Sequence, residues 1–367
     1  MTIGFDAKRL FCNFTGLGNH SRTTVDMLCR SYPDLQMVLY TPHMVQNDTT
    51  APYTCRRGCR VVTPRGLIGG SVWRTVCLAD EAARDGVDVF HGLSNELPWD
   101  LQRKGVRSVV TIHDVAFRTF PDMYHAHDRL VYDLKWRHAC RVADVIIAIS
   151  ECTKRDIMRF YGVDESHMRV VYQPVGLEYY DQPLDPSPET EPYMLYVGSV
   201  NSRKNLMGVV QAIGLLPADM RMRLVVVGDG GAYKREVAEY IERQGLSHLV
   251  EWRKAVDVPT LRRLYTDATM MVYPSFYEGF GLPVVEASLC QCPVITSNVS
   301  SLPEAGGPHA LTVDPNHPDD IAQKMEMLIG DEDLRQQTGR QARQYAMQAF
   351  HPQTLARQLM DVYESCL

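Results

Sequence analysis

The chain has 367 residues, which exceeds one typical domain and favours two domains of roughly 150–200 residues. Its 45% hydrophobic and 22% charged residues are ordinary for a globular protein, and a net charge of −6 argues against a general nucleic-acid binder. The chain shows no basic segment followed by a long apolar stretch, and no apolar run of the roughly 18 residues that span a bilayer. We therefore expect a cytoplasmic protein.

Short runs rich in Val and Ile alternate with longer helix-patterned stretches along the chain. In the first half the predicted strands are 2–6, 36–40, 87–90, 107–112 and 144–149, with helical stretches at 18–30 and 128–142. In the second half the predicted strands are 193–197, 223–227, 249–252, 270–273, 293–296 and 311–313, followed by a helical segment at 334–367. Continuous apolar runs are typical of parallel strands buried on both faces, so the pattern predicts an α/β protein.

A proline- and acid-rich stretch, QPVGLEYYDQPLDPSPETEPY at 173–193, shows neither strand nor helix periodicity and predicts a linker. The predicted organisation is an N-terminal Rossmann-like domain at 1–172, a linker at 173–192, a C-terminal Rossmann-like domain at 193–345 and a helix at 346–367. Two doubly wound sheets joined in this way are expected to face each other across a cleft, with ligands beyond the carboxyl ends of the strands.

The ten cysteines include two close pairs, Cys55 with Cys59 and Cys290 with Cys292. Neither spacing is the paired C-x-x-C pattern of a structural zinc site. Without an export signal we expect reduced thiols and no metal.

Polar and glycine residues follow nearly every predicted strand. Gly16 and Gly18 precede a helix, His91 and His113 each end or follow a strand, and Arg203 with Lys204 follows strand 193–197. Singly, each has an ordinary explanation as a turn, a core histidine or a solvated loop. Together they suit a sugar nucleotide, because glycine turns at helix starts present N–H groups and two cations neutralise a diphosphate without a metal.

The segment YEGFGLPVVEA at 277–287 carries two carboxylates. Pro283 fits the first turn of a helix and leaves the amides of Gly281 and Leu282 at its entry. Glu278 then precedes the helix and Glu286 lies about one turn into it. We predict that Glu278 binds sugar hydroxyls and Glu286 the nucleotide, although a glycosidase acid/base pair is an alternative.

Several motifs resemble family 4 of the retaining glycosyltransferases with the GT-B fold, in the same order. They are TGLGNHSR at 15–22, TIHDVAF at 111–117, AISECTKRDI at 148–157, YVGSVNSRKNL at 196–206, EGFGLPVVEA at 278–287 and SNVSSLPEAGG at 297–307. The stretch at 113–150 is most similar to bacterial mannosyltransferase-like members that build surface polysaccharides such as lipopolysaccharide.

The resemblance implies a role for each matching residue. Gly16 would approach the donor diphosphate, His113 would lie beside the donor sugar, and Arg203 and Lys204 would hold the diphosphate. Glu278 would bind the sugar hydroxyls and Glu286 the ribose. The backbone of Phe280, Gly281 and Leu282 would lie near sugar or phosphate. The resemblance also implies that the N-terminal domain binds the acceptor and the C-terminal domain binds the nucleotide sugar. It further implies no obligatory metal or cofactor, and a C-terminal helix that crosses back to the N-terminal domain.

Two positions depart from the family pattern. In VYQPVG at 171–176, Gln173 stands where many relatives carry the asparagine of an Asn-Gly pair, and the glycine falls at 176. Cys292 precedes a proline where a small residue is usual. We expect neither to disturb the donor site.

The resemblance favours a hexosyltransferase that moves mannose from GDP-mannose to a glycan or lipid-linked saccharide. A UDP-sugar-dependent transferase and a non-catalytic sugar-nucleotide binder are alternatives, and an epimerase or a phosphorylase is a more remote one.

Residues 49–79 contain five arginines, one tryptophan and no acid. One hypothesis is that this segment contacts a lipid diphosphate or the inner face of a membrane through Arg56, Arg57, Arg60, Arg65, Leu67, Ile68, Trp73 and Arg74. The alternative is an ordinary solvated loop.

Overall fold

The computed structural model describes residues 1–64, 69–181, 183–184 and 191–367. The chain divides into two compact units: unit 1 comprises Met1–Leu177 and Pro352–Leu367, and unit 2 comprises Glu178–His351. Relative to the bounds expected from the sequence, residues 173–177 lie in unit 1 and residues 346–351 in unit 2.

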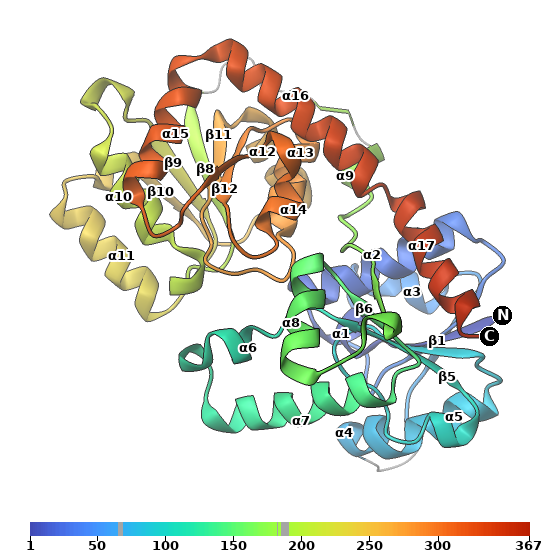
Figure 1. Cartoon of the computed structure of the whole chain (residues 1–367). Coiled ribbons are helices and arrows are strands. Elements are labelled where there is room, and N and C mark those ends of the chain that lie inside the picture. The colour runs from blue at the N-terminus through green and yellow to red at the C-terminus, as the bar shows by residue number, and fades with distance from the viewer. Residues whose placement is uncertain (65–68, 182, 185–190) are drawn as a thin grey trace. The chain divides into compact units, whose positions relative to one another are not determined.

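Unit 1 contains a seven-stranded parallel sheet with the order β3-β2-β1-β4-β5-β6-β7. Figure 1 labels β1, β5 and β6 of this sheet. Its strands are β1 (Thr2–Asp6), β2 (Gln36–Tyr40), β3 (Cys59–Val62), β4 (Val89–Gly92), β5 (Arg107–Ile112), β6 (Val145–Ala148) and β7 (Met168–Val170). The order reverses between β1 and β4, which is the switch point of a doubly wound sheet.

The helices of unit 1 cover both faces of this sheet. They are α1 (Lys8–Cys12), α2 (Gly16–Ser31), α3 (Ala51–Thr54), α4 (Gly70–Val72), α5 (Leu78–Arg84), α6 (Ala116–Thr119), α7 (Ala126–Val142), α8 (Glu151–Tyr161) and α17 (Pro352–Ser365). Short helical turns lie at Trp73–Cys77, Gln102–Lys104, Pro121–Met123 and Glu165–His167.

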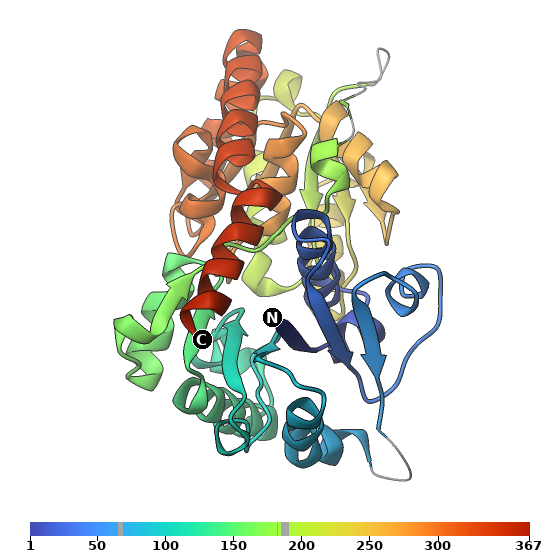
Figure 2. The ribbon, with the colours of Figure 1, turned by 90° about the vertical axis from the view of Figure 1, so that its right-hand side faces the viewer.

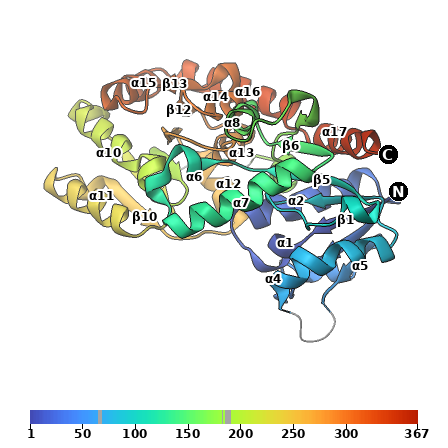
Figure 3. The same cartoon turned by 60° about the horizontal axis from the view of Figure 1, so that its bottom comes forward.

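Alternate side chains of the strands enter two separate cores, because successive residues of a strand point to opposite faces. Phe5 packs with Leu28 of α2 and Leu359 of α17 in one core. Phe90 packs with Leu78 of α5 in the other core, where α7 contributes Ala139 and lies against β5 (Figure 3). Both layers are therefore needed to bury the sheet.

Unit 2 contains a six-stranded parallel sheet with the order β10-β9-β8-β11-β12-β13. Its strands are β8 (Tyr193–Val197), β9 (Arg223–Val227), β10 (Val250–Arg253), β11 (Met270–Tyr273), β12 (Val294–Ser297) and β13 (Leu311–Val313). Its helices are α9 (Glu178–Asp181), α10 (Leu206–Leu215), α11 (Ala232–Arg243), α12 (Val258–Asp267), α13 (Leu282–Leu289), α14 (Leu302–Gly306), α15 (Pro318–Gly330) and α16 (Glu332–Ala349). Its switch point lies between β8 and β11.

The predicted α/β class with two doubly wound sheets is confirmed. The sequence pattern did not predict two strands, β3 and β7, which lie at opposite edges of the unit 1 sheet. In Figure 2, β3 is the blue arrow from which the chain continues into the lower grey trace. Edge strands pair on one side only, and both contain exposed positions, Arg60 and Arg169, that interrupt the apolar run. The helical segment predicted at 334–367 is divided before Pro352, whose ring disfavours helical backbone in the preceding residue.

Among the described residues, no helix is long and apolar enough to cross a membrane.

Candidate active site

The loop after β8 holds two cations at the switch point of unit 2. The side chain of Asn201 accepts from the N–H of Lys204 at 3.2 Å and caps the short turn Ser202–Lys204. Asn205 follows in a left-handed conformation, with φ of 56°, and donates to the carbonyl of Pro315 at 2.8 Å. Gly198, with φ of 140°, leaves room for Lys204, because a Cβ there would lie 3.2 Å from Nζ. The loop conformation therefore fixes where Arg203 and Lys204 point.

Arg203, Lys204 and Glu278 form an ion-paired cluster between this loop and the loop after β11. Arg203 lies 3.1 Å from Glu278 Oε2 and Lys204 lies 3.2 Å from Oε1. Lys204 also donates to the Tyr273 hydroxyl, and Arg203 to the carbonyl of Tyr277. The three charged side chains are 12–18% exposed, so the cluster is shielded from most solvent. It carries one positive charge more than its carboxylate neutralises.

Serines from two loops fix the Glu278 carboxylate and its backbone. Ser275 donates to Oε1 at 3.1 Å. Ser300 both accepts from the Glu278 N–H at 3.0 Å and donates to its carbonyl at 2.7 Å. Ser301 donates to the carbonyls of Glu278 and Phe280, each at 2.8 Å. Glu278 is thereby positioned before any ligand binds.

The pKa of Glu278 lies far below its ordinary value. Burial alone raises a carboxyl pKa, but the charges of Lys204 and Arg203, with the Tyr273 hydroxyl bond, lower the pKa of Glu278 to about 2. The carboxylate is therefore ionised at neutral pH and accepts hydrogen bonds. A general acid would instead need a pKa near the working pH.

Gly281 and Pro283 form the helix entry that the sequence predicts. Gly281 is the N-cap of α13 with φ of 114°, and Pro283 lies in the first turn. A Cβ at Gly281 would lie 2.8 Å from Leu302 Cδ2, so both backbone conformation and packing require glycine. Val284 and Val285 donate their N–H groups to the Gly281 carbonyl at 2.9 and 3.4 Å, and Pro283 has no N–H. The Leu282 N–H, which lacks an acceptor within the helix, is available to an anion or a hydroxyl.

Glu286 occupies a different environment from Glu278. Its Oε2 accepts from the Tyr265 hydroxyl at 2.9 Å. Burial raises the pKa of Glu286 to about 7, with Glu178 adding to the rise and Tyr265 opposing it. Lys204 also lies within electrostatic reach. The assignment of Glu286 to ribose hydroxyls stays a prediction.

The two glycines at the start of α2 differ in what surrounds them. Asn13 Oδ1 accepts from the N–H of Thr15 and of Gly18, each at 3.0 Å. Gly18 is buried, and a Cβ there would lie 1.7 Å from the Asn13 carbonyl oxygen, so glycine is required. Gly16 is the exposed first residue of α2, with open space around it. Diphosphate approach at Gly16 stays a prediction, as does ligand contact by Gly18.

His113 follows β5 and is buried in unit 1. Its Nε2 donates to the Leu93 carbonyl at 2.8 Å, which leaves Nδ1 as the acceptor. Gln173 Nε2 lies 3.3 Å from that Nδ1. Burial lowers the pKa of His113, so its imidazole is neutral. Gln173 therefore contacts His113 directly, and the expectation that Gln173 does not disturb the donor site stays a prediction.

Other sequence candidates have structural roles. His91 is buried, with Nδ1 2.7 Å from the Tyr363 hydroxyl and Nε2 2.8 Å from the Thr111 hydroxyl, as expected of a core histidine. A Cβ at Gly228 would lie 1.9 Å from the Gly198 carbonyl oxygen, so the glycine turn after β9 packs tightly against the cationic loop. Cys292 is buried in the core.

The arginines of segment 49–79 are largely paired with acids from elsewhere in the sequence. Arg56 pairs with Asp26, Arg60 with Asp85 at 2.8 Å, and Arg74 with Asp6. Trp73 is buried in the core, whereas Arg57 is exposed, and Arg65, Leu67 and Ile68 lie outside the described residues. The basic surface suggested by the sequence is thus much reduced by tertiary ion pairs.

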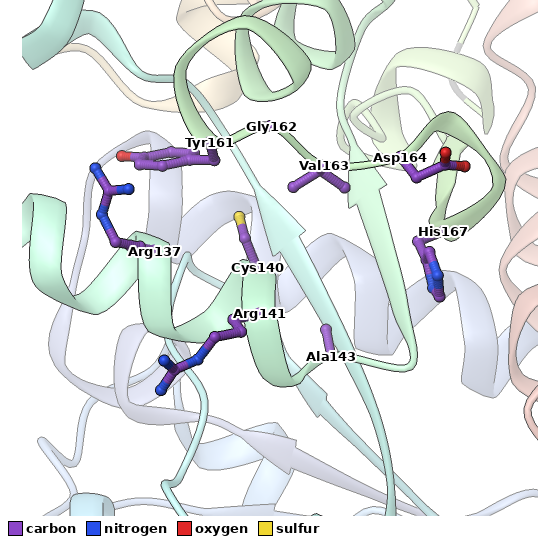
Figure 4. Close-up of a pocket in the computed structure, with 9 residues that line it drawn as sticks. All are labelled: Arg137, Cys140, Arg141, Ala143, Tyr161, Gly162, Val163, Asp164 and His167. Carbon is purple, nitrogen blue, oxygen red and sulfur yellow. The ribbon is translucent and has the colours of Figure 1, made fainter.

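A cavity of about 400 Å³ lies between the C-terminal ends of α7 and α8 (Figure 4). It is lined by Arg137, Cys140, Arg141, Ala143, Tyr161, Gly162, Val163, Asp164 and His167. Ala143 precedes β6, and residues 162–167 precede β7, so the cavity lies at the amino ends of these strands. Ligands of doubly wound sheets bind at the opposite, carboxyl ends.

The described part of the chain contains no group of three or more His, Cys, Asp and Glu side chains that could hold a metal ion. Counter-charge for a diphosphate in unit 2 is instead available from Arg203 and Lys204.

Sequence reasoning missed Tyr273, Ser275, Ser300 and Ser301, which position Glu278. Tyr273 is the last residue of β11, and Ser275 follows it by two positions. The final residue of a buried parallel strand lies beside the ligand-binding edge of the sheet, and this position is a signal for Tyr273. The serines carry no comparable signal, because serine is common in any loop.

Two family models and several curated relatives match this chain. Residues 183–345 match the family described as Glycosyl transferases group 1, and residues 16–179 match Glycosyltransferase Family 4. The chain is 33% identical over 290 residues to O-antigen chain mannosyltransferase B of Escherichia coli, covering 75% of each chain. It is 32% identical over 181 residues to a D-inositol 3-phosphate glycosyltransferase of Paenarthrobacter aurescens, covering 48% of this chain and 44% of the relative.

Solved structures share the whole fold at low sequence identity. Sucrose-phosphate synthase of Thermosynechococcus elongatus has a TM-score of 0.78 and 21% identity, covering 100% of this chain and 98% of that one. Anabaena HepE, solved in complex with UDP, has a TM-score of 0.75 and 16% identity, covering 99% of both chains. The glycosidase, epimerase and phosphorylase alternatives are therefore set aside: the chain belongs to family 4 of the glycosyltransferases, has the GT-B fold and is a hexosyltransferase.

Proposed function

We propose that this enzyme transfers mannose, with retention of anomeric configuration, from GDP-mannose to a saccharide or lipid-linked saccharide acceptor during surface polysaccharide synthesis. The observation that carries the proposal is the Arg203–Lys204–Glu278 cluster at the switch point of unit 2. The choice of mannose rests on the similarity to the Escherichia coli O-antigen mannosyltransferase.

The cluster has the chemistry to bind a nucleotide-diphosphate sugar and to stabilise its departure. Arg203 offers a planar fork and Lys204 a point charge, and both are already aligned by Glu278 and Tyr273. When a diphosphate binds, the excess positive charge is neutralised and the negative charge that develops on the leaving group is stabilised. Glu278, kept ionised, accepts hydrogen bonds from the hydroxyls of the sugar.

Retention by a front-face reaction is the mechanism we favour. The leaving-group phosphate would take the proton of the acceptor hydroxyl, so that no protein carboxylate need attack the sugar. The Glu278 carboxylate is held by Lys204, Arg203 and Tyr273, which suits an anchor better than a nucleophile. Nuclear magnetic resonance of the product would show an α-linkage from the α-linked donor, and a β-linked product would exclude retention.

A panel of nucleotides tests the donor assignment. Binding of GDP or GDP-mannose at one hundred times its Kd adds about 2.7 kcal/mol to stability and should raise the Tm of the protein by several degrees. UDP-glucose and ADP-glucose at the same concentration should give much smaller shifts. A shift with UDP-sugars and none with GDP or GDP-mannose would contradict the mannosyl assignment. That result is the main alternative, because Anabaena HepE was solved with UDP.

The proposal also includes turnover without a metal, since two side-chain cations can neutralise the diphosphate. We expect the transfer rate in excess EDTA to equal the rate with added Mg²⁺. A rate that falls with EDTA and returns with Mg²⁺ would show that a cation is needed.

Contact between the enzyme and the inner face of a membrane remains a sequence-based prediction. Arg57 is an exposed arginine of the segment 49–79, and it has no ion pair among the described residues. Sedimentation with anionic liposomes should decrease when Arg57 is changed to Glu, and equal sedimentation of variant and wild type would remove the hypothesis.

A further inference from the structure

Unit 1 contains a cavity of about 250 Å³ that the donor site does not use. Its walls come from four separate segments, namely the end of β1, the turn at Trp73–Cys77, the loop after β4 and helix α7. The lining residues are Asp6, Arg74, Thr75, Glu96, Leu97, Pro98, Trp99, Lys135 and His138.

The cavity lies at the switch point of the unit 1 sheet. Asp6 is the last residue of β1, and Glu96 lies in the loop after β4, which ends at Gly92. The strand order reverses between these two strands. Parallel doubly wound sheets bind ligands at this place, whereas the larger cavity of Figure 4 lies at the amino ends of β6 and β7. Position therefore favours the smaller cavity as a ligand site.

The floor of the cavity is polar, and its charges balance. Arg74 pairs with Asp6 and lies 3.4 Å from Glu96, and Lys135 lies 3.1 Å from Glu96. Asp6 and Arg74 are almost wholly buried, with side chains 6% and 10% exposed. Two carboxylates paired with two cations attract a phosphate weakly, but their oxygens accept from O–H donors and their N–H groups donate to hydroxyl oxygens. This chemistry fits a neutral, hydroxyl-rich ligand.

Trp99 supplies an apolar wall beside this floor. It is 62% exposed, although tryptophan is usually buried. Its backbone N–H donates to the carbonyl of Thr75 at 3.1 Å, and its ring lies 5.5 Å from that of His138. An aromatic face held next to paired charges matches a sugar ring, which has one apolar C–H face and a rim of hydroxyls.

The size of the cavity limits what it holds. Sites for drug-sized ligands have volumes of about 300–1,000 Å³, so a cavity of about 250 Å³ is suited to one sugar ring rather than to a nucleotide sugar.

We propose that this cavity binds a monosaccharide unit of the acceptor, with Trp99 against the ring and the Asp6, Arg74 and Glu96 side chains bound to its hydroxyls. The inference rests on the proposed transferase function and extends it, because it assigns acceptor binding to named residues of unit 1.

Three variants of the full-length enzyme test the assignment. Trp99→Ala should raise the KM for the acceptor about tenfold, because losing an aromatic contact of this kind weakens binding by up to about tenfold. The KM for GDP-mannose should stay within about twofold of wild type. Trp99→Phe, which keeps an aromatic face, should recover most of the loss. Val76→Ala removes an exposed side chain of the turn Trp73–Cys77, 54% exposed and outside the cavity lining, and should behave as wild type.

A binding experiment without donor gives a second readout. Saturation-transfer NMR with methyl α-mannoside and α-linked mannobiose should show transfer to the sugar protons in wild type, and a reduced signal in Trp99→Ala. Equal acceptor KM and equal saturation transfer in wild type and Trp99→Ala would overturn the inference. If the wild-type enzyme transferred from a UDP-sugar instead, the donor assignment would be wrong. The effect of Trp99→Ala on acceptor binding would still test the acceptor site independently.

Discussion

Lys204 lies between the Glu278 carboxylate and the Tyr273 hydroxyl, and from this position we predict how its removal changes the rate of transfer. Lys204→Ala removes one of the two charges available to a leaving diphosphate and leaves Glu278 facing Arg203 alone. We expect the rate of transfer to fall by a factor of about 10²–10³, the loss typical of removing one transition-state donor.

Lys104→Ala provides the control for that change, because Lys104 pairs with Asp80 at 2.6 Å on the surface of unit 1. Radiolabelled donor turnover should be unaffected by it. A Lys204→Ala enzyme with near-normal turnover would show that Lys204 has no part in the reaction.

Glu286 makes stability depend on pH. Its pKa is about 7 in the folded protein and near 4.5 when unperturbed, so between these values the folded state retains a proton that the unfolded chain has lost. The contribution of Glu286 to the free energy of unfolding is therefore fully present below pH 4.5 and is lost as the pH rises to about 7. Glu286→Gln lacks this dependence.

Relative to wild type, the Tm of Glu286→Gln should therefore rise between pH 5 and pH 7 and then level off. Differential scanning fluorimetry at several pH values measures this difference. Glu239→Gln, at an exposed position of α11, is the matched substitution away from the buried site. A difference between Glu286→Gln and wild type that stays constant over this pH range would contradict the raised pKa.

At the scale of elements, a buried hydrogen bond joins α17 to the sheet of unit 1. Tyr363 donates to or accepts from His91 Nδ1 at 2.7 Å, and its ring also packs on Phe5. Tyr363→Phe keeps the ring and leaves the histidine nitrogen buried without that partner, so the free energy of unfolding should fall by about 1–3 kcal/mol.

Urea unfolding followed by circular dichroism would measure that loss. Ser365→Ala is the matched change on the same helix, because the exposed Ser365 donates its hydroxyl to the carbonyl of Val362 within the helix and makes no contact with the sheet among the contacts that the structure describes. It should alter stability by less than about 0.5 kcal/mol. Equal effects of the two substitutions would mean that the His91 contact contributes little.

The strands were predictable wherever burial on both faces produced a continuous apolar run, as in RLVVV of β9. The edge strands β3 and β7 were not, since their sequences mix arginine with apolar residues. Lys204 and Glu278 could also be predicted, because they follow the ends of buried strands. The ion pairs of Arg56 and Arg60 could not be predicted, because their partners are distant in the sequence and no local pattern indicates them.

At the scale of the whole molecule, unit 1 is assembled from both ends of the chain. Leu355, Leu359 and Tyr363 of α17 are buried in the same core as Phe5 of β1. A chain that ends after His351 should therefore expose this core and lose cooperative unfolding of unit 1, with low soluble yield and increased binding of an apolar dye.

Deletion of Leu367 alone, which is 65% exposed, should leave yield and unfolding unchanged. A soluble, cooperatively folded protein that ends after His351 would show that α17 is dispensable for unit 1.

The position of α17 in the chain has a consequence for synthesis in the cell. Residues 178–351 separate the first part of unit 1 from its last helix. At about 5–20 residues per second, a ribosome needs roughly 10–35 s to make them. During that time the nascent sheet of unit 1 lacks the side chains of α17 that cover one face, while unit 2 is being completed. The domain that is translated first is thus the last to finish folding, and chaperones have a defined interval in which to protect its apolar surface.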